Sequence, residues 1–114
     1  MAFSKLELEL IDNEVGGLCR KLNHPEYKVE LSIEYRVYRQ DVIIYERRPA
    51  FNKPDENIEI PAAKLKYFRT KYEWRLYWMR KDLKWHIYKP FSSSVSLGDL
   101  LAEVKSDPYG CFFG

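Results

Sequence analysis

The sequence has few cysteines, histidines and glycines, and each shortage argues against a class of protein. Its 114 residues include two cysteines, Cys19 and Cys111, whereas small secreted domains usually carry several pairs. We therefore expect free thiols and a cytoplasmic location. The two cysteines and two histidines lie far apart and match no metal-ligand spacing. No Gly-rich phosphate-binding loop is present, so neither a metal nor a cofactor is predicted.

Long hydrophobic runs are also missing. No stretch approaches the roughly 20 apolar residues of a membrane-spanning helix. The first residues contain no basic region followed by an apolar run, so we expect no signal peptide and no membrane partner. Hydrophobic residues make up 46% of the chain, which argues against disorder. The length predicts a single domain over residues 1–114.

Aromatic residues and local positive charge are what the sequence has in excess. Aromatics form 16% of the chain; their large rings bury much area per residue and favour strands. The net charge is only +2, but residues 61–90 carry nine basic side chains against Glu73 and Asp82. Such polarity favours an anionic partner. The alternative is a basic sheet face partly covered by the protein's own acidic helix.

The first segment has the periodicity of a helix. Its apolar residues recur at steps of three and four, which places them on one stripe: Leu8, Ile11, Val15, Leu18 and Leu22. Ser4 and Glu7 have the spacing of a capping box. Gly16 and Gly17 predict either close packing on another element or a kink. Asn23, His24 and Pro25 end the helix.

Residues 29–37 and 42–47 predict the first two strands. Strict apolar and polar alternation over residues 29–37 is typical of a half-buried strand. A turn at Gln40 and Asp41 would place Val37 opposite Ile44, and Glu34 opposite Arg47. Pro49 ends the second strand, and residues 50–60 are predicted to form a surface loop.

Three more alternating segments, at residues 63–68, 73–79 and 83–88, predict a meander. A turn near Thr70 and Lys71 pairs Leu65 with Leu76. A turn at Lys81 and Asp82 pairs Trp78 with Trp85, Leu76 with Ile87, and Tyr77 with His86. The predicted inward face then contains Leu31, Ile33, Val37, Ile44, Leu65, Trp74, Leu76, Trp78, Trp85 and Ile87.

A second helix is predicted from Ser96, and it completes the fold. Its apolar face consists of Leu97, Leu100, Leu101 and Val104, and Asp107 with Pro108 ends it. We expect Phe112 or Phe113 to dock into the core. The element order predicts an α+β fold: an N-terminal helix, a five-stranded antiparallel meander-like sheet and a C-terminal helix, with both helices packed on one sheet face.

The opposite sheet face is the main candidate binding surface. Its predicted residues alternate cations with rings, which suits phosphates and stacked bases: Lys64, Lys66, Arg75, Tyr77, His86 and Tyr88. The alternative is an ordinary solvated face.

Arg47 and Arg48, beside Phe51, form a second candidate that could fork onto a carboxylate or phosphate. The alternative there is that Arg47 pairs with Glu34 and Arg48 pairs with a helix acid.

Catalysis has little support in the sequence. His86 with Tyr77 is the one general-base candidate, but neither Glu73 nor Asp82 is predicted to lie close to His86, and an oriented base needs such a partner. We therefore predict that the protein is not an enzyme and has no catalytic residues.

The order and spacing of several motifs resemble those of a known family. They are Tyr45-Glu46-Arg47-Arg48-Pro49, Trp74-Arg75-Leu76-Tyr77-Trp78, Trp85-His86, and the ending Leu100-Leu101-Ala102-Glu103, Asp107-Pro108, Gly110, Phe112 and Gly114. On these motifs, nearly the whole chain resembles the bacterial domain-of-unknown-function family 3024. The resemblance implies bacterial origin and a compact single domain, and it implies no reaction.

The preferred functional hypothesis is a non-enzymatic interaction or binding module with a protein or anionic partner. The alternative is a nucleic-acid-binding accessory protein that uses the basic aromatic sheet face. A small enzyme is the least favoured hypothesis. Exposed aromatics also allow a weak homodimer beside the monomer.

Overall fold

The computed structural model describes residues 2–23, 31–53 and 55–113. The N-terminal helical segment comprises α1 (Lys5–Ile11), a π-helical turn η1 (Asp12–Gly16) and α2 (Gly17–Leu22). The strands are β1 (Ser32–Tyr38), β2 (Asp41–Pro49), β3 (Asn57–Phe68), β4 (Glu73–Met79), β5 (Trp85–Ile87) and β6 (Ser93–Ser94). Two 3₁₀ turns, η2 (Arg69–Lys71) and η3 (Lys89–Phe91), and the helix α3 (Leu97–Ser106) complete the chain.

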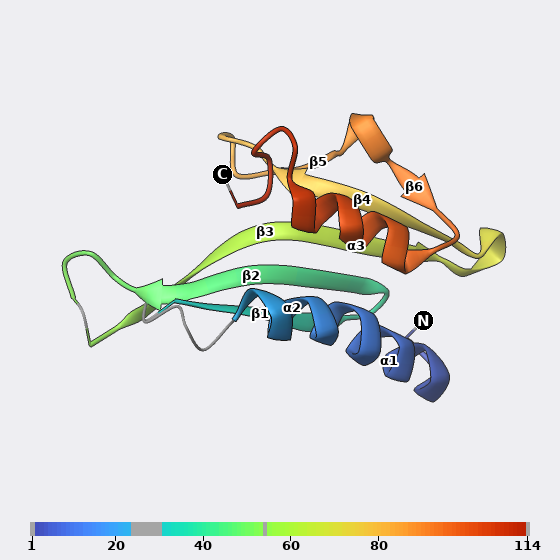
Figure 1. Cartoon of the computed structure of the whole chain (residues 1–114), viewed down its shortest axis with the longest axis horizontal. Coiled ribbons are helices and arrows are strands. Elements are labelled where there is room, and N and C mark those ends of the chain that lie inside the picture. The colour runs from blue at the N-terminus through green and yellow to red at the C-terminus, as the bar shows by residue number, and fades with distance from the viewer. Residues whose placement is uncertain (1, 24–30, 54, 114) are drawn as a thin grey trace.

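The predicted α+β fold is confirmed. The strands follow the order β1-β2-β3-β4-β5, all antiparallel, and the short β6 also pairs with β4. Both helical segments lie on the same side of the sheet (Figure 1). Their apolar residues join the inward residues of the strands in one buried cluster, with Ile11, Val15, Leu100 and Val104 fully buried. This leaves the opposite sheet face without a covering element among the described residues.

The N-terminal helix forms as predicted, with one irregularity. Ser4 and Glu7 make the expected capping box. The π-helical turn includes Gly16, where an added Cβ would lie 3.0 Å from Asp12 Oδ1 and 3.5 Å from Tyr35 Cε1. The tight contact is with Asp12 of the same helical segment, whereas the distance to Tyr35 of β1 is ordinary van der Waals contact, so the close packing on another element that the glycine pair predicted does not explain Gly16. The predicted stop at His24 and Pro25, like the strand start at Val29, lies outside the described residues.

The β1–β2 register differs from the prediction by two residues. The turn contains Arg39 and Gln40, so Val37 lies opposite Val42. Arg39 has a φ of 56°, a left-handed conformation that glycine or asparagine usually supplies, so nothing in the sequence marks this turn. A shift of two leaves every side chain on its predicted face.

The predicted loop over residues 50–60 is too long. β3 begins at Asn57, and Ala50 N–H donates to the Glu56 carbonyl at 2.8 Å to close a shorter loop. A β-bulge in the β2–β3 ladder brings Tyr45 opposite Pro61 and leaves one extra residue in β3. Pro54 and three acids predicted a loop, but residues 57–60 pair with β2, and proline is tolerated in a strand beside a bulge such as the one at Pro61.

The β3–β4 pairing is confirmed, with Leu65 opposite Leu76 and Lys64 opposite Tyr77. The β4–β5 register is wrong by one residue, since Trp78 lies opposite His86 and Tyr77 lies opposite Ile87. A one-residue slip reverses the faces. Trp85 and Ile87 therefore point outward, and His86 lies on the inward side.

The cause of the slip is a three-residue loop where two residues were predicted. Leu83 N–H donates to the Arg80 carbonyl, and Arg80 N–H donates to the Lys84 carbonyl. Leu83, with a φ of 61°, occupies the left-handed position that ends such a loop.

The C-terminal helix and tail match the prediction. Ser96 caps α3 by accepting from Asp99 N–H, and Leu97, Leu100, Leu101 and Val104 are buried. The Asp107 carboxylate accepts from Phe112 N–H at 3.1 Å and from Phe113 N–H at 2.8 Å. Phe112 is buried against Tyr88, with ring centroids 4.9 Å apart.

Candidate functional site

The uncovered sheet face divides into two parts of different charge. One part, on β3, β4 and β5, is called here the cation–ring patch, and its side chains alternate between cations and aromatic rings: Lys64, Lys66, Phe68, Arg75, Tyr77 and Trp85. All six are half-buried. The antiparallel ladder sets this arrangement, because directly opposite residues point to the same face.

Lys64 lies at the centre of the cation–ring patch. Its Nζ is 4.9 Å from the centroid of the Tyr77 ring and 5.7 Å from that of Trp85. Both distances are within the range of cation–π attraction. Among the described residues, Lys64 forms no ion pair with a carboxylate. Its positive charge is therefore held in place by rings and left without a neutralising acid.

Arg75 forms the second cation–ring contact of the patch. Its guanidinium lies 4.0 Å from the centroid of Phe68, and its Nε contacts Glu73 Oε2 at 3.0 Å. Lys66 lies directly opposite Arg75 and has no ion pair among the residues described. Asp41 of β2 also lies directly opposite Lys66, so Lys64, Lys66 and Arg75 against Glu73 and Asp41 leave a net charge of about +1, which favours an anion near the neighbouring cations.

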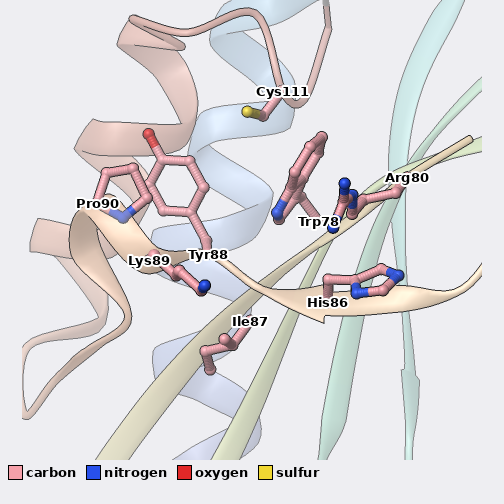
Figure 2. Close-up of a pocket in the computed structure, with 8 residues that line it drawn as sticks. All are labelled: Trp78, Arg80, His86, Ile87, Tyr88, Lys89, Pro90 and Cys111. Atoms are coloured by element: carbon pink, nitrogen blue, oxygen red, sulfur yellow. The ribbon is translucent and has the colours of Figure 1, made fainter.

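Two of the predicted site residues lie elsewhere. Tyr88 is buried, and its hydroxyl donates to Glu103 at 2.6 Å, so it cannot belong to an open surface. His86 lies on the other side of the sheet, opposite Trp78, and lines a pocket there (Figure 2). The expectation that Asp82 lies far from His86 is also wrong, since Asp82 Oδ2 is 2.8 Å from His86 Nε2. This contact lowers the pKa of Asp82.

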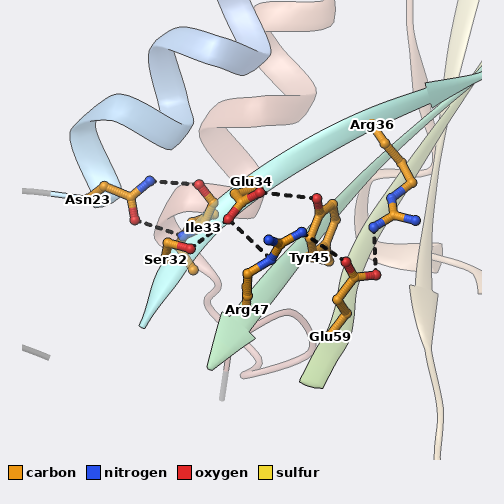
Figure 3. Close-up of polar contacts among 8 residues, drawn as sticks. All are labelled: Asn23, Ser32, Ile33, Glu34, Arg36, Tyr45, Arg47 and Glu59. Carbon is orange, nitrogen blue, oxygen red and sulfur yellow. Dashed lines mark hydrogen bonds and ion pairs between the residues drawn. The ribbon is translucent and has the colours of Figure 1, made fainter. Parts of the chain in front are cut away.

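The second part of the uncovered face, around β1 and β2, neutralises its own charges (Figure 3). Glu34 accepts from Ser32 at 2.7 Å and from the Tyr45 hydroxyl at 3.2 Å, and Arg47 lies 3.5 Å away. The Ser32 hydrogen bond is the main cause, and Arg47 a lesser one, of a lowered Glu34 pKa. The arginines and acids of this network are therefore occupied with each other.

Glu59 connects Arg36 to Arg47 and so adds Arg36 to this network. Arg47 Nη2 lies 3.2 Å from one carboxylate oxygen of Glu59, and Arg36 Nη2 lies 2.5 Å from the other. Arg36 also lies over the Tyr45 ring, 4.4 Å from its centroid, which explains why Tyr45 is buried on an otherwise open face.

For the Arg47 and Arg48 candidate, the structure favours the alternative that both arginines pair with acids of the protein itself. Arg47 pairs with Glu34, as that alternative predicted, although Tyr45 and not Arg47 lies directly opposite Glu34 in the ladder. Arg48 pairs with Glu46 at 3.5 Å and not with a helix acid.

Both thiols have the environment of packing residues. Burial raises the pKa of Cys19 to about 11, and burial together with Asp107 raises the pKa of Cys111. A raised pKa disfavours the thiolate, which is the nucleophilic form. In the described ranges, no three His, Cys, Asp or Glu side chains are grouped so that they could hold a metal ion, and no helix is long and apolar enough to cross a membrane.

Sequence reasoning missed Trp85 and Phe68 as members of the patch. Trp85 was assigned to the core because the β4–β5 slip reversed its face. Phe68 was not singled out, although its alternation with Leu65 and Tyr67 places it outward, and that signal could have identified it.

These features define an α+β protein in which two helical segments cover one face of an antiparallel sheet and a cation–ring patch stays open on the other. The family model of the domain of unknown function DUF3024 matches residues 3–114, and the chain belongs to this family. The resemblance found in the sequence motifs is thereby confirmed. No curated protein and no solved structure gives a significant match.

Proposed function

We propose that this protein is a non-enzymatic binding module that holds a polyanionic partner on the cation–ring patch. The observation that carries the proposal is the position of Lys64, whose ammonium lies on Tyr77 and Trp85 without a carboxylate partner among the described residues. Two acids of the same face, Glu34 and Glu59, are gathered around Arg36 and Arg47, and Glu73 pairs with Arg75. The open cations and the open rings thus occupy one surface.

Single-stranded nucleic acid is the partner that this surface fits best. Its phosphates suit Lys64, Lys66 and Arg75, and its bases suit the half-buried rings of Tyr77 and Trp85. Stacking of a base on a ring is worth about 1–3 kcal/mol by alanine substitution. An acidic peptide offers the charges without the flat bases, so it would use only half of the patch.

The non-enzymatic part of the proposal is supported by the state of the reactive groups. Both thiols have raised pKa values, and the Tyr77–His86 pair that was the general-base candidate lies on opposite faces. The proposal includes a cytoplasmic location, which the two free cysteines support because a reducing compartment keeps thiols free.

The test is the affinity for a fluorescently labelled oligothymidylate, measured by anisotropy at several salt concentrations. We expect binding at low salt that weakens as salt rises, with a log–log slope of about −1.4 to −2.1 for two or three phosphate contacts. Lys64→Gln is expected to lower the magnitude of this slope by about 0.7. Trp85→Leu is expected to weaken binding at every salt concentration, because it removes a stacking surface.

Arg36→Gln is the matched control, since Arg36 is a cation of the same sheet face that already pairs with Glu59. We expect it to leave the affinity nearly unchanged. The proposal is wrong if no binding occurs at low salt, or if Arg36→Gln weakens binding as much as Lys64→Gln does. Equal competition by polyglutamate would show a partner recognised by charge alone and would remove the nucleic-acid assignment.

A further inference from the structure

A pocket of about 410 Å³ lies on the other side of the sheet, between the β4–β5 hairpin and the C-terminal tail. Its walls are largely apolar and come from Trp78, Tyr88, Pro90 and Cys111, and Ile87 borders it although its side chain points to the other face (Figure 2). The volume is within the range of about 300–1,000 Å³ that is typical of small-molecule sites. It is independent of the cation–ring patch, with which it shares no residue.

The walls of the pocket are fixed in place by specific contacts. The Tyr88 hydroxyl donates to Glu103, and Phe112 packs on the Tyr88 ring. The Asp107 carboxylate accepts from two backbone N–H groups of the tail, at Phe112 and Phe113, which positions the adjacent Cys111. A pocket that exists before its ligand arrives binds without the cost of ordering its walls.

The charged groups of the pocket lining all come from basic residues. They are Arg80 and Lys89, beside which His86 adds an imidazole ring, and no carboxylate lines the pocket. Asp82 contacts His86 at 2.8 Å from outside the lining. The Arg80 guanidinium lies 5.6 Å from the Trp78 ring centroid. Trp78 Nε1, a donor that no other side chain occupies in the described part of the chain, adds a neutral hydrogen-bond donor.

We infer that this pocket binds a small aromatic carboxylate, with its ring between Trp78 and Tyr88 and its carboxylate toward Arg80 and Lys89. The apolar walls exclude a strongly hydrated ion such as free phosphate, because they offer it few donors. The basic lining disfavours a neutral hydrocarbon relative to its acid, because a carboxylate gains charge-assisted hydrogen bonds there. One or two fused rings with one acid group fit the volume and the charge together.

The test uses 2-naphthoate as the probe and two-dimensional ¹H–¹⁵N NMR of the full chain as the readout. We expect saturable shifts of the Trp78 indole N–H and of the Ile87 and Cys111 amides, with a Kd on the order of 0.1–1 mM. 2-Naphthamide, which has the same rings without the charge, is expected to bind about fivefold or more weakly. Failure to see saturable shifts, or equal binding of acid and amide, would overturn the proposal.

Variants separate the pocket from the rest of the surface. Arg80→Gln and Lys89→Gln change exposed side chains and are each expected to raise the Kd about two- to fivefold. Cys111→Phe is expected to abolish binding by filling the pocket. The control is Lys66→Gln, a cation of the opposite face, which should leave the Kd unchanged. If Lys66→Gln raises the Kd as much as Lys89→Gln does, the site is wrong. Oligothymidylate binding can fail without affecting this result, because the two surfaces are separate.

Discussion

Glu7 connects the beginning of the chain to the end of β3. Its carboxylate accepts from Ser4 N–H at 2.8 Å, which completes the capping box of α1. It also accepts from Arg69 Nη2 at 2.6 Å and from Arg69 Nε at 3.3 Å. The Arg69 hydrogen bonds are the main cause of a Glu7 pKa below its ordinary value of 4.5. One side chain thus joins helix initiation to helix–sheet packing.

Glu7→Gln is expected to reduce the free energy of unfolding by about 1 kcal/mol at neutral pH. Glutamine can still accept from Ser4 but lacks the charge that binds Arg69. Because the folded-state pKa of Glu7 is lowered, its stabilisation is present above the ordinary pKa and is lost as pH falls through the folded value. Urea unfolding from about pH 7 to about pH 3 should therefore show the difference from wild type shrinking toward zero.

The control for this comparison is Glu9→Gln, because Glu9 is an exposed acid on the same helix. We expect it to change stability little at either pH. A Glu7→Gln variant as stable as wild type at neutral pH, or one whose deficit persists in acid, would contradict the assigned role.

Side-chain contacts of this kind could be predicted only where they are local. The capping box was predicted from the spacing of Ser4 and Glu7, and it is confirmed. The Asn23 amide, in contrast, donates to the Ile33 carbonyl at 2.6 Å and accepts from Ile33 N–H at 2.7 Å (Figure 3). It occupies backbone groups of β1 that β2 leaves free. Nothing in the sequence links these two positions, so only the fold reveals the contact.

At the scale of elements, the β4–β5 hairpin shows how the backbone conformation of one loop residue determines which side chains of β5 point to the open sheet face. Leu83 is 80% exposed and has a φ of 61°, so it supplies a left-handed residue and buries almost nothing. Glycine or asparagine at this position would have predicted the three-residue loop. Leucine gives no such signal, so a two-residue turn was predicted. That prediction placed Trp85 and His86 on the wrong faces of the sheet.

Leu83→Gly is expected to stabilise the protein by about 0.5–1 kcal/mol, since glycine adopts a left-handed conformation without the Cβ penalty. Part of that gain is offset by the greater freedom of glycine in the unfolded chain. Thermal unfolding measures the effect as a rise in Tm of a few degrees.

Leu83→Ala is the matched variant for this measurement. It removes the same exposed side chain but keeps the Cβ and therefore the strain. We expect its stability to stay near that of wild type. If the glycine variant is no more stable than the alanine variant, then the left-handed conformation of Leu83 is not strained, and this explanation of the register is wrong.

The β3–β4 pairing is the part of the sheet register that was predicted correctly. Alternation together with a turn near Thr70 and Lys71 gave this pairing, although Tyr72 in the turn has a left-handed φ of 49°. The β1–β2 register moved by two residues at Arg39. Strand β3 begins earlier than predicted, because residues 57–60 continue the pairing with β2 beyond the bulge at Pro61. Each error lies at a turn or bulge, where pattern gives least information.

At the scale of the whole molecule, the helices and the charges divide the surface. One sheet face supports both helical segments and the buried cluster, and the other holds the cation–ring patch beside a neutralised network. Of the eight candidate residues, Lys64, Lys66, Arg75 and Tyr77 lie together in the patch. Arg47 and Arg48 lie with acids, and His86 and Tyr88 lie on the helix side. The composition predicted that a basic aromatic surface exists. Which residues belong to it depends on the strand register, which the structure supplies.

The three tryptophans allow the central claim to be tested in one titration, because they occupy three different environments. Trp74 is buried in the core, Trp78 lines the pocket on the helix side, and Trp85 lies on the open face. Each indole N–H gives its own NMR signal, which a tryptophan-to-phenylalanine substitution assigns.

Oligothymidylate added at low salt is predicted to move the Trp85 indole signal and to leave those of Trp74 and Trp78 in place. A Trp85 signal that stays still, or a Trp78 signal that moves with it, would contradict the claim that the open face of the sheet is where a partner binds.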